Sequence, residues 1–192
     1  MNKNEFNAVL HEMEEYGHLL TPNRVSIHIP NAMQEMKDCI SQFISTPVWL
    51  PEYNKVASWL TDNKKKGLLC IGNCGRGKTI LCRRVIPMLI YHFCRKHVSV
   101  YDAIDINTKI DEMKTKHLLS IDDIGTESDY FVYGVRRQPF QEIADSAEKT
   151  GKLLLITTNL TISQIQEKYG IRTLDRLRKV TSVVEFIGKS YR

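Results

Sequence analysis

The sequence predicts an α/β fold in three layers, with a five-stranded parallel sheet between two layers of helices. From residue 68 onward, short apolar runs alternate with stretches in which apolar residues follow helical spacing. The short runs are continuously apolar, which is typical of parallel strands covered by helices on both faces. A chain of 192 residues, 42% apolar and 26% charged, is long enough to bury a core as one domain.

The first fifty residues predict a short helical N-terminal segment. Its first helix places four apolar residues at helical spacing: Phe6, Val9, Leu10 and Met13. Asn31 and Gln34 have the spacing of a capping box, so a second helix is expected to begin there. We therefore divide the chain into residues 1–50, a helical segment suited to binding a partner, and a domain over residues 51–192 that opens with a helix near 51–62.

The domain itself is expected to alternate strands and helices. The expected strands are residues 68–72, 98–102, 118–122, 153–157 and 183–187. The expected helices are near residues 78–96, 106–115, 135–149, 161–169 and 173–179. Pro87 lies inside the first of these helices and is expected to kink it. Thr161 and Gln164 form a second candidate capping box, and Gly151 is a candidate helix stop.

Charge and cysteine patterns narrow the function classes. The net charge is +5, and the last 25 residues carry seven Lys or Arg against only Asp175 and Glu185. Such a basic segment is compatible with contact to phosphate or nucleic acid, and equally with a solvated basic surface. The five cysteines lack a paired C-x-x-C spacing, which argues for reduced thiols rather than zinc ligands.

No segment has the composition of a membrane span or of a secretory signal. The longest apolar runs, such as residues 153–157, have five or six residues, far fewer than a bilayer-spanning helix needs. The charged N-terminus also lacks the apolar core of a signal peptide. We therefore expect a cytoplasmic protein without a membrane partner.

The most specific motif is a phosphate-binding loop. Residues 72–79 fit G-x-x-x-x-G-K-[ST] in full, between an expected strand and an expected helix. The loop's N–H groups and the helix N-terminus would face phosphate oxygens, Lys78 would reach the β- and γ-phosphates, and Thr79 would ligate Mg²⁺. The expected ATP-binding residues are therefore Gly72, Asn73, Cys74, Gly75, Arg76, Gly77, Lys78 and Thr79.

Two further strand ends supply candidate catalytic groups. Residues 118–121 form an apolar run that ends in Asp122 and Asp123. Asp122 is placed to hold Mg²⁺ together with Thr79, often through water, and Asp123 is the candidate to orient or deprotonate the attacking water. Asn159 follows the next apolar run, where its side chain could reach the γ-phosphate or the water.

Together these motifs resemble the AAA+ ATPases, specifically the group of DnaC-type helicase loaders and IstB-type transposition helpers. The resemblance covers roughly residues 50–192 and depends on GNCGRGKT, LLSIDDIG, LLLITTNL and the ending YGIRTLDRLRKVTSVVEFIGKSYR. It implies that Asn159 is the sensor residue and that Arg172 and Arg176 match the family's arginine pair. It further implies that Arg172 acts in trans on the ATP of a neighbouring subunit, so that activity requires an ATP-dependent homo-oligomer.

The sequence departs from the family's pattern in three places. Asp123 stands where many AAA+ proteins have Glu, which predicts slow hydrolysis. Only five residues follow Ile187, so no C-terminal helical lid is expected. Only about fifteen residues separate the second expected strand from the acidic one, which leaves little room for the helical insertion that loaders use to hold single-stranded DNA.

The sequence therefore favours a DnaC-like ATPase that uses ATP and Mg²⁺, binds single-stranded DNA weakly, and loads or regulates a replicative helicase. Three alternatives remain open at this point. An IstB-like helper would deliver a transposase, and a nucleotide-gated adaptor would bind ATP with little hydrolysis. A small-molecule or nucleoside kinase shares the phosphate-binding loop, although the TTN run with its late arginine pair is not a kinase pattern.

Overall fold

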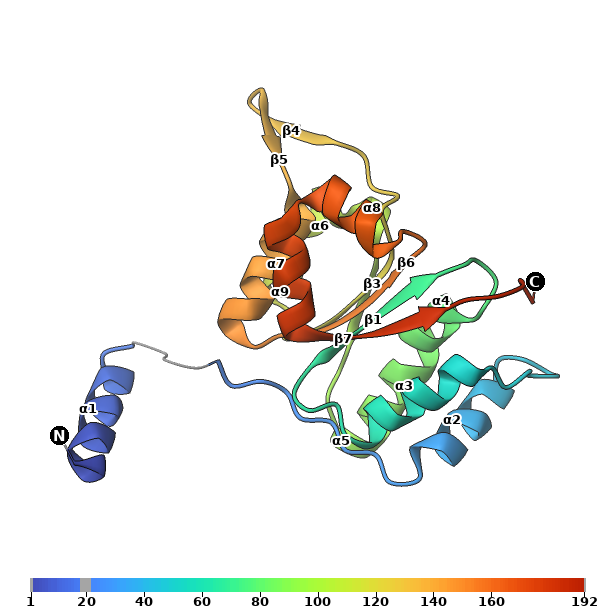
Figure 1. Ribbon diagram of the computed structural model, residues 1–192, viewed down its shortest axis with the longest axis horizontal. Coiled ribbons are helices and arrows are strands. Elements are labelled where there is room, and N and C mark those ends of the chain that lie inside the picture. The colour runs from blue at the N-terminus through green and yellow to red at the C-terminus, as the bar shows by residue number, and fades with distance from the viewer. Residues whose placement is uncertain (1, 18–21, 192) are drawn as a thin grey trace.

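The computed structural model describes residues 2–17 and 22–191 and confirms the predicted parallel sheet (Figure 1). Its strands are β1 (Gly67–Gly72), β2 (Ser99–Asp102), β3 (Leu118–Ile124), β6 (Leu153–Thr158) and β7 (Thr181–Phe186). They lie in the order β2-β3-β6-β1-β7, and every neighbouring pair is parallel. The strand β1, which leads into the phosphate-binding loop, therefore lies between β6 and β7 inside the sheet.

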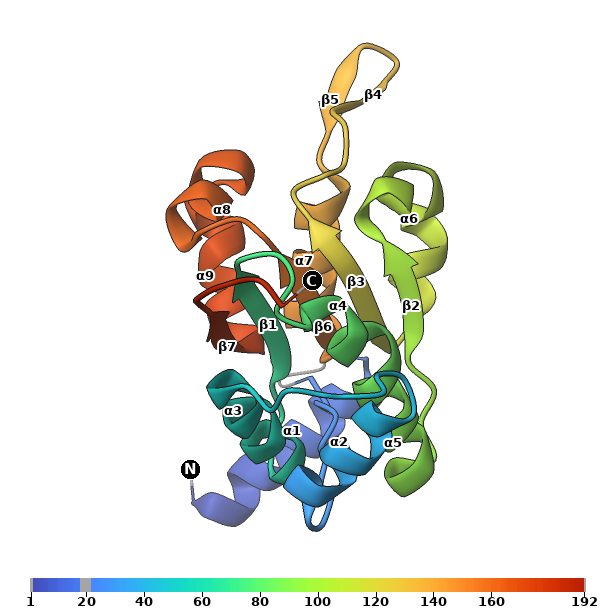
Figure 2. The same cartoon turned by 90° about the vertical axis from the view of Figure 1, so that its right-hand side faces the viewer.

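Helices cover both faces of this sheet, as Figure 2 shows. One face carries α2 (Ala32–Ser41), α3 (Pro51–Thr61), α4 (Lys78–Ile80), the π-helix η1 (Leu81–Val85) and α5 (Ile86–Cys94). The other carries the 3₁₀ turn η2 (Ala103–Asp105), α6 (Ile106–Thr115), α7 (Pro139–Thr150), α8 (Ile162–Tyr169) and α9 (Ile171–Val180). Adjacent β1 residues alternate between the two cores, with Leu68 in one and Leu69 in the other. No helix of the described ranges is both long and apolar enough to cross a membrane.

The two parts of the N-terminal segment differ in burial. The first helix, α1 (Lys3–Glu15), buries none of its residues. By contrast, Val25, Ile27 and Ile29 belong to the same buried cluster as β1 and α3. The side chain of Asn63 fixes this stretch, because its Oδ1 accepts from the Ile27 N–H at 2.8 Å and its Nδ2 donates to the Val25 carbonyl at 3.0 Å. Residues 25–50 therefore share the core of the domain that the sequence places after residue 51.

One predicted helix begins later than expected. The sequence predicts a helix over residues 135–149, but residues 130–137 form a hairpin of β4 (Tyr130–Val132) and β5 (Val135–Arg137). Tyr133 and Gly134 have φ values of 50° and 78°, as the two central residues of a tight hairpin turn require. Helix α7 starts only at Pro139, which favours the first turn because it has no N–H to donate. The hairpin projects from the body of the domain (Figures 1 and 2).

The helix expected over residues 78–96 is not a regular α-helix ahead of Pro87. A proline here cannot donate to the Arg83 carbonyl and would clash with it in a regular α-helix. The chain instead forms the π-helical turn η1 directly before the proline, with the Ile86 N–H bonded to the Leu81 carbonyl. The Cys82 carbonyl in this turn accepts from the Ser120 hydroxyl of β3 at 2.8 Å. The π-turn thus anchors Arg83 next to the ends of β2 and β3.

Candidate nucleotide-binding site

The loop between β1 and α4 has the backbone shape that phosphate binding requires. Gly77, the residue before α4, has a φ of 83°, which disfavours any side chain. A Cβ atom there would lie 2.1 Å from the Tyr53 hydroxyl of α3, so the loop passes this helix at close range. The loop consequently presents main-chain N–H groups rather than side chains to a ligand at the start of the helix.

Lys78 lies in this loop with its ammonium group directed to neutral acceptors. The side chain is buried, and its Nζ donates to the Gly72 and Asn73 carbonyls at 2.7 Å each and to Asn159 Oδ1 at 3.0 Å. Burial lowers the pKa of this ammonium, against an opposing effect of nearby anionic groups. Because its hydrogen-bond partners are all uncharged, a phosphate chain in the loop would supply the counter-charge that a buried cation needs.

Asn159 connects Lys78 to the acidic end of β3. Its Oδ1 accepts from Lys78, while its Nδ2 donates to Asp123 Oδ1 at 2.8 Å. The strands β3 and β6 are neighbours, so their carboxyl ends place Asp123 and Asn159 side by side. Three residues that the sequence assigns to one site, separated by up to 81 positions, are thereby joined in one hydrogen-bonded chain.

A backbone irregularity turns Asp123 into the cavity. Between Ile121 and Ile124 the pairing of β3 with β6 shifts register, and Asp123 has a φ of 62°, which is uncommon for a residue with a side chain. Its N–H donates to Thr157 Oγ1 at 2.8 Å, which fixes this turn. Asp123 is half-buried and lines the cavity, as a residue that contacts an attacking water must.

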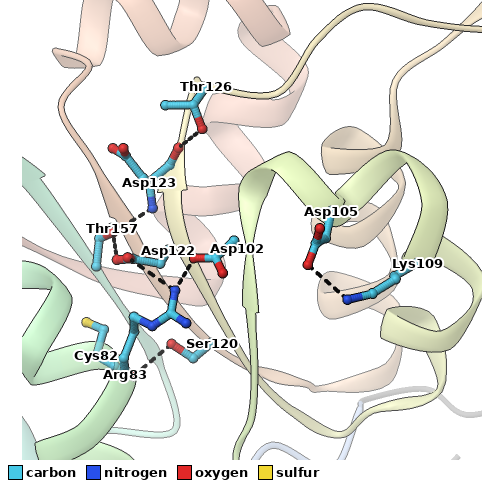
Figure 3. A network of polar contacts seen from close by, with 10 residues as sticks. All are labelled: Cys82, Arg83, Asp102, Asp105, Lys109, Ser120, Asp122, Asp123, Thr126 and Thr157. Carbon is cyan, nitrogen blue, oxygen red and sulfur yellow. Dashed lines mark hydrogen bonds and ion pairs between the residues drawn. The ribbon is translucent and has the colours of Figure 1, made fainter.

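Asp122 points to a different set of partners, shown in Figure 3. The Thr157 hydroxyl donates to Asp122 Oδ1 at 2.6 Å, and Arg83 Nη1 lies 3.6 Å from Asp122 Oδ2. Arg83 also pairs with Asp102 at the end of β2, and this contact is the largest cause of the raised pKa of the guanidinium. Asp122 itself is buried and is not among the residues that line the cavity. Sequence reasoning did not identify Arg83 or Asp102, because neither belongs to a motif.

The residues around the loop fit a nucleotide that is bound together with Mg²⁺. The Thr79 side chain is exposed and lines the cavity beside Lys78, so its hydroxyl is accessible as a hard oxygen ligand. Among the described residues, no cluster of three or more His, Cys, Asp or Glu could hold a metal ion by itself. A magnesium ion would therefore be held jointly by Thr79 and phosphate oxygens, with Asp122 behind Thr157.

The cavity above the loop has a volume of about 740 Å³ and two chemically different parts. The polar part comprises the loop, Asp123 and Asn159. The other part is largely apolar and includes Ile44, Val48, Leu50 and Tyr53 of the segment 44–53, and Tyr191 lines the cavity as well. Neither stretch was expected to contribute from the sequence, because their positions in the chain give no motif or spacing that points to the loop.

The two late arginines have different surroundings. Arg176 is held within its own chain, with Nη2 2.8 Å from Asp145 Oδ1 and Nε 3.2 Å from Glu148 Oε2. Arg172 lies exposed in the first turn of α9 and is not among the cavity-lining residues of the described chain. The structure thus brings together Lys78, Thr79, Asp123 and Asn159, and leaves Arg172 on the surface.

Comparisons with known proteins identify the fold. No protein-family model matches the sequence, and no curated protein does. Among solved structures, the DnaC helicase loader has a TM-score of 0.61 and 17% identity over 74% of this chain and 94% of that one. DnaI has a TM-score of 0.59 and 17% identity over 84% and 96% of the two chains. AMPPCP-bound DnaA from Aquifex aeolicus has a TM-score of 0.52 and 15% identity over 73% and 48%. These similarities confirm the predicted three-layer fold, which the chain shares with the DnaC helicase loader and DnaI.

Proposed function

We propose that this protein is a DnaC-like AAA+ ATPase that binds ATP and Mg²⁺ and acts in DNA replication by loading or regulating a replicative helicase. The observation that carries the proposal is the bonded chain of Lys78, Asn159 and Asp123 at the polar end of a cavity large enough for a nucleotide. The fold shared with the DnaC helicase loader, DnaI and AMPPCP-bound DnaA supports the assignment to replication.

Each residue of the site has a separate role in this proposal. Lys78 and the loop N–H groups bind the phosphates, and Asp123 holds the attacking water and accepts its proton. Asn159 orients Asp123 through one hydrogen bond and contacts Lys78 through the other. In this position it senses whether the last phosphate is bound beside Lys78. Bound Mg²⁺ supplies charge neutralisation at the phosphate oxygens. Arg172 lies outside the cavity of its own chain, so we assign it to the ATP of a neighbouring subunit in an ATP-dependent homo-oligomer.

Two exposed features suit macromolecular partners in the cytoplasm. Helix α1 leaves Phe6 and Val9 57% and 43% exposed on one apolar face, which suits docking to the helicase. At the hairpin, Phe131 is 59% exposed and Tyr133 is fully exposed. Because aromatic side chains stack on unpaired bases, we assign the hairpin to weak binding of single-stranded DNA. An IstB-like role would use the same ATPase site with a transposase in place of the helicase.

One observation favours the nucleotide-gated adaptor as a second candidate. The Asp123 carboxylate is one methylene shorter than Glu and already accepts a hydrogen bond from Asn159 at 2.8 Å. A carboxylate held in this way binds a water less freely, so nucleotide binding with little turnover is the alternative outcome.

The test measures equilibrium ATP binding and steady-state turnover at several protein concentrations, with and without single-stranded DNA. We expect Lys78→Ala to abolish both binding and turnover. Lys152→Ala is the matched control, because Lys152 is another buried lysine bonded to main-chain carbonyls but lies outside the cavity. Turnover that rises with protein concentration and DNA supports the loader. Tight binding with negligible turnover under every condition supports the adaptor, and binding unaffected by Lys78→Ala would exclude both.

A further inference from the structure

Residues 188–191, which we call the C-terminal strap, lie against the phosphate-binding loop. After β7 the chain turns back towards α4, as Figure 2 shows. Three loop residues bind it: Asn73 Nδ2 donates to the Gly188 carbonyl at 3.1 Å, Arg76 Nη1 donates to the Lys189 carbonyl at 2.9 Å, and the Gly75 carbonyl accepts from the Tyr191 N–H at 2.9 Å. Variable positions of the loop motif are thus used to hold a segment more than a hundred residues away.

Arg76, which binds the strap, is itself held in place by Glu52 of α3. Arg76 is only 6% exposed, and its Nε donates to Glu52 Oε1 of α3 at 2.5 Å. A buried cation requires such a partner, so the geometry of the guanidinium is strongly constrained. Gly188 approaches it so closely that a Cβ atom would lie 2.7 Å from Arg76 Nη1. The strap can therefore follow this path only because residue 188 is a glycine with a φ of 131°.

The strap places an aromatic ring at the cavity. Tyr191 lines the cavity, and the Arg76 guanidinium lies 5.6 Å from the centre of its ring. The phosphates of a nucleotide would occupy the polar part next to Lys78, which leaves the base for the part that contains Val48, Leu50 and Tyr53. Tyr191 lines the same cavity from the opposite end of the chain, next to Gly75 and Arg76.

We propose that Tyr191 is a base-binding residue, held by the strap so that its ring packs against the nucleobase of the bound nucleotide. The proposal rests on the ATP site proposed above and assigns recognition of the base to a residue outside every motif of the sequence. Because the Tyr191 N–H is bonded to the Gly75 carbonyl, the backbone that carries the ring is already held at the cavity before a base stacks on it. The ligand class is therefore a nucleotide, of which the base contributes part of the affinity.

The experiment compares ATP with inorganic tripolyphosphate, which carries the phosphates without a base. Affinities for both are measured by competition against a fluorescent ATP analogue, using the full chain. We expect Tyr191→Ala to weaken ATP binding by about tenfold, the scale of losing one base–aromatic stack. Tripolyphosphate binding should be unchanged, and Tyr191→Phe should restore ATP binding because the ring remains. Tyr91→Ala is the matched control, since Tyr91 is 57% exposed against 59% for Tyr191 and lies on α5 outside the cavity.

The outcomes separate this proposal from the proposed function. If Tyr191→Ala leaves ATP binding intact while Lys78→Ala abolishes it, the nucleotide site stands and the role of Tyr191 is refuted. An equal loss of ATP and tripolyphosphate affinity also refutes base binding, because the strap would then act only on the shape of the loop. If Lys78→Ala has no effect on either ligand, the proposed function itself fails.

Discussion

Asn159 makes two bonds that serve opposite ends of the candidate site. Its amide oxygen accepts from Lys78, and its amide nitrogen donates to Asp123. A single planar group thereby sets the distance between the phosphate-binding cation and the carboxylate that is proposed to hold water. Loss of this group should leave Lys78 on its two carbonyl partners, while Asp123 loses the contact that orients it.

We therefore expect Asn159→Ala to separate binding from turnover. ATP affinity should change by less than about threefold, whereas kcat should fall by at least about tenfold, because a general base that is no longer positioned contributes less to catalysis. Asn4→Ala, on the exposed helix α1, is the matched control. A parallel loss of affinity and kcat would contradict this assignment and show that Asn159 mainly supports the loop.

At the residue scale, the sequence predicted those contacts that motifs encode. The loop, Asp123 and Asn159 meet because parallel strands bring their carboxyl ends to one edge of the sheet. Arg83, Glu52 and Tyr191 were not predicted. Each meets the site through a contact between distant parts of the chain, such as the 24 positions between Glu52 and Arg76, and no local spacing encodes such a contact.

At the scale of single elements, the two candidate capping boxes have different outcomes. Thr161 Oγ1 accepts from the Gln164 N–H at 3.2 Å and Gln164 Oε1 accepts from the Thr161 N–H at 2.8 Å, so this box forms as predicted. The prediction at Asn31 was wrong: its φ of 52° is left-handed, and its side chain makes no capping bond. The helix begins there nonetheless, since Met36 and Ile40 are buried in the core that α2 shares with α3 and α5. Burial of the apolar face determined this helix, not the cap.

Three carboxylates of helix α7 are expected to make the stability of the fold depend on pH. The pKa values of Glu142, Asp145 and Glu148 are lowered, chiefly by hydrogen bonds from Arg137, Lys149 and Lys179 respectively. A carboxylate whose pKa is lowered in the folded state stabilises the fold at pH values above its ordinary pKa. This contribution is lost as the pH falls through the lowered pKa of the folded state. We therefore expect the urea midpoint to fall as pH decreases below about 4.5, the ordinary pKa of Glu.

Glu148→Gln tests this, because Glu148 joins α7 to Arg176 and Lys179 of α9. The variant should be less stable than the parent protein at pH 7, and its urea midpoint should fall less steeply below pH 4.5. Glu12→Gln on α1 is the control with no expected effect on either quantity, since that helix buries no residue. An unchanged slope in Glu148→Gln would show that this carboxylate does not contribute to acid sensitivity.

For the whole molecule, the continuous apolar runs were sufficient to predict the sheet and its parallel strands. They were not sufficient for the hairpin at residues 130–137, because its apolar residues Phe131 and Val132 belong to neither buried core and so do not follow the burial pattern of the sheet. They also do not show that residues 25–29 join the core, since three alternate apolar residues fit a surface strand as well.

Assembly is a property of the whole molecule, and a variant of Arg172 tests it. It lies exposed in the first turn of α9, outside the cavity of its own chain. If it completes a neighbour's site, Arg172→Ala should bind ATP normally but lose the rise of specific turnover with protein concentration, by at least about a hundredfold at saturation. Arg178→Ala, an exposed arginine of the same helix, is the matched control.

Adding ATPase-dead Lys78→Ala chains to the Arg172→Ala variant gives the decisive comparison. Each Lys78→Ala chain can donate Arg172 to a neighbour, so turnover should recover in the mixture although neither variant is active alone. A mixture that stays inactive would contradict action in trans.

The position of the strap has a consequence for the synthesis of the protein. The phosphate-binding loop at residues 72–79 emerges from the ribosome early, but its neighbours β6 and β7 and the Tyr191 wall of the cavity emerge more than seventy residues later. A nascent chain that already displays the loop therefore has no nucleotide site. If ATP binds as proposed, it can stabilise the fold fully only after β6, β7 and Tyr191 have been synthesised and have packed around the loop.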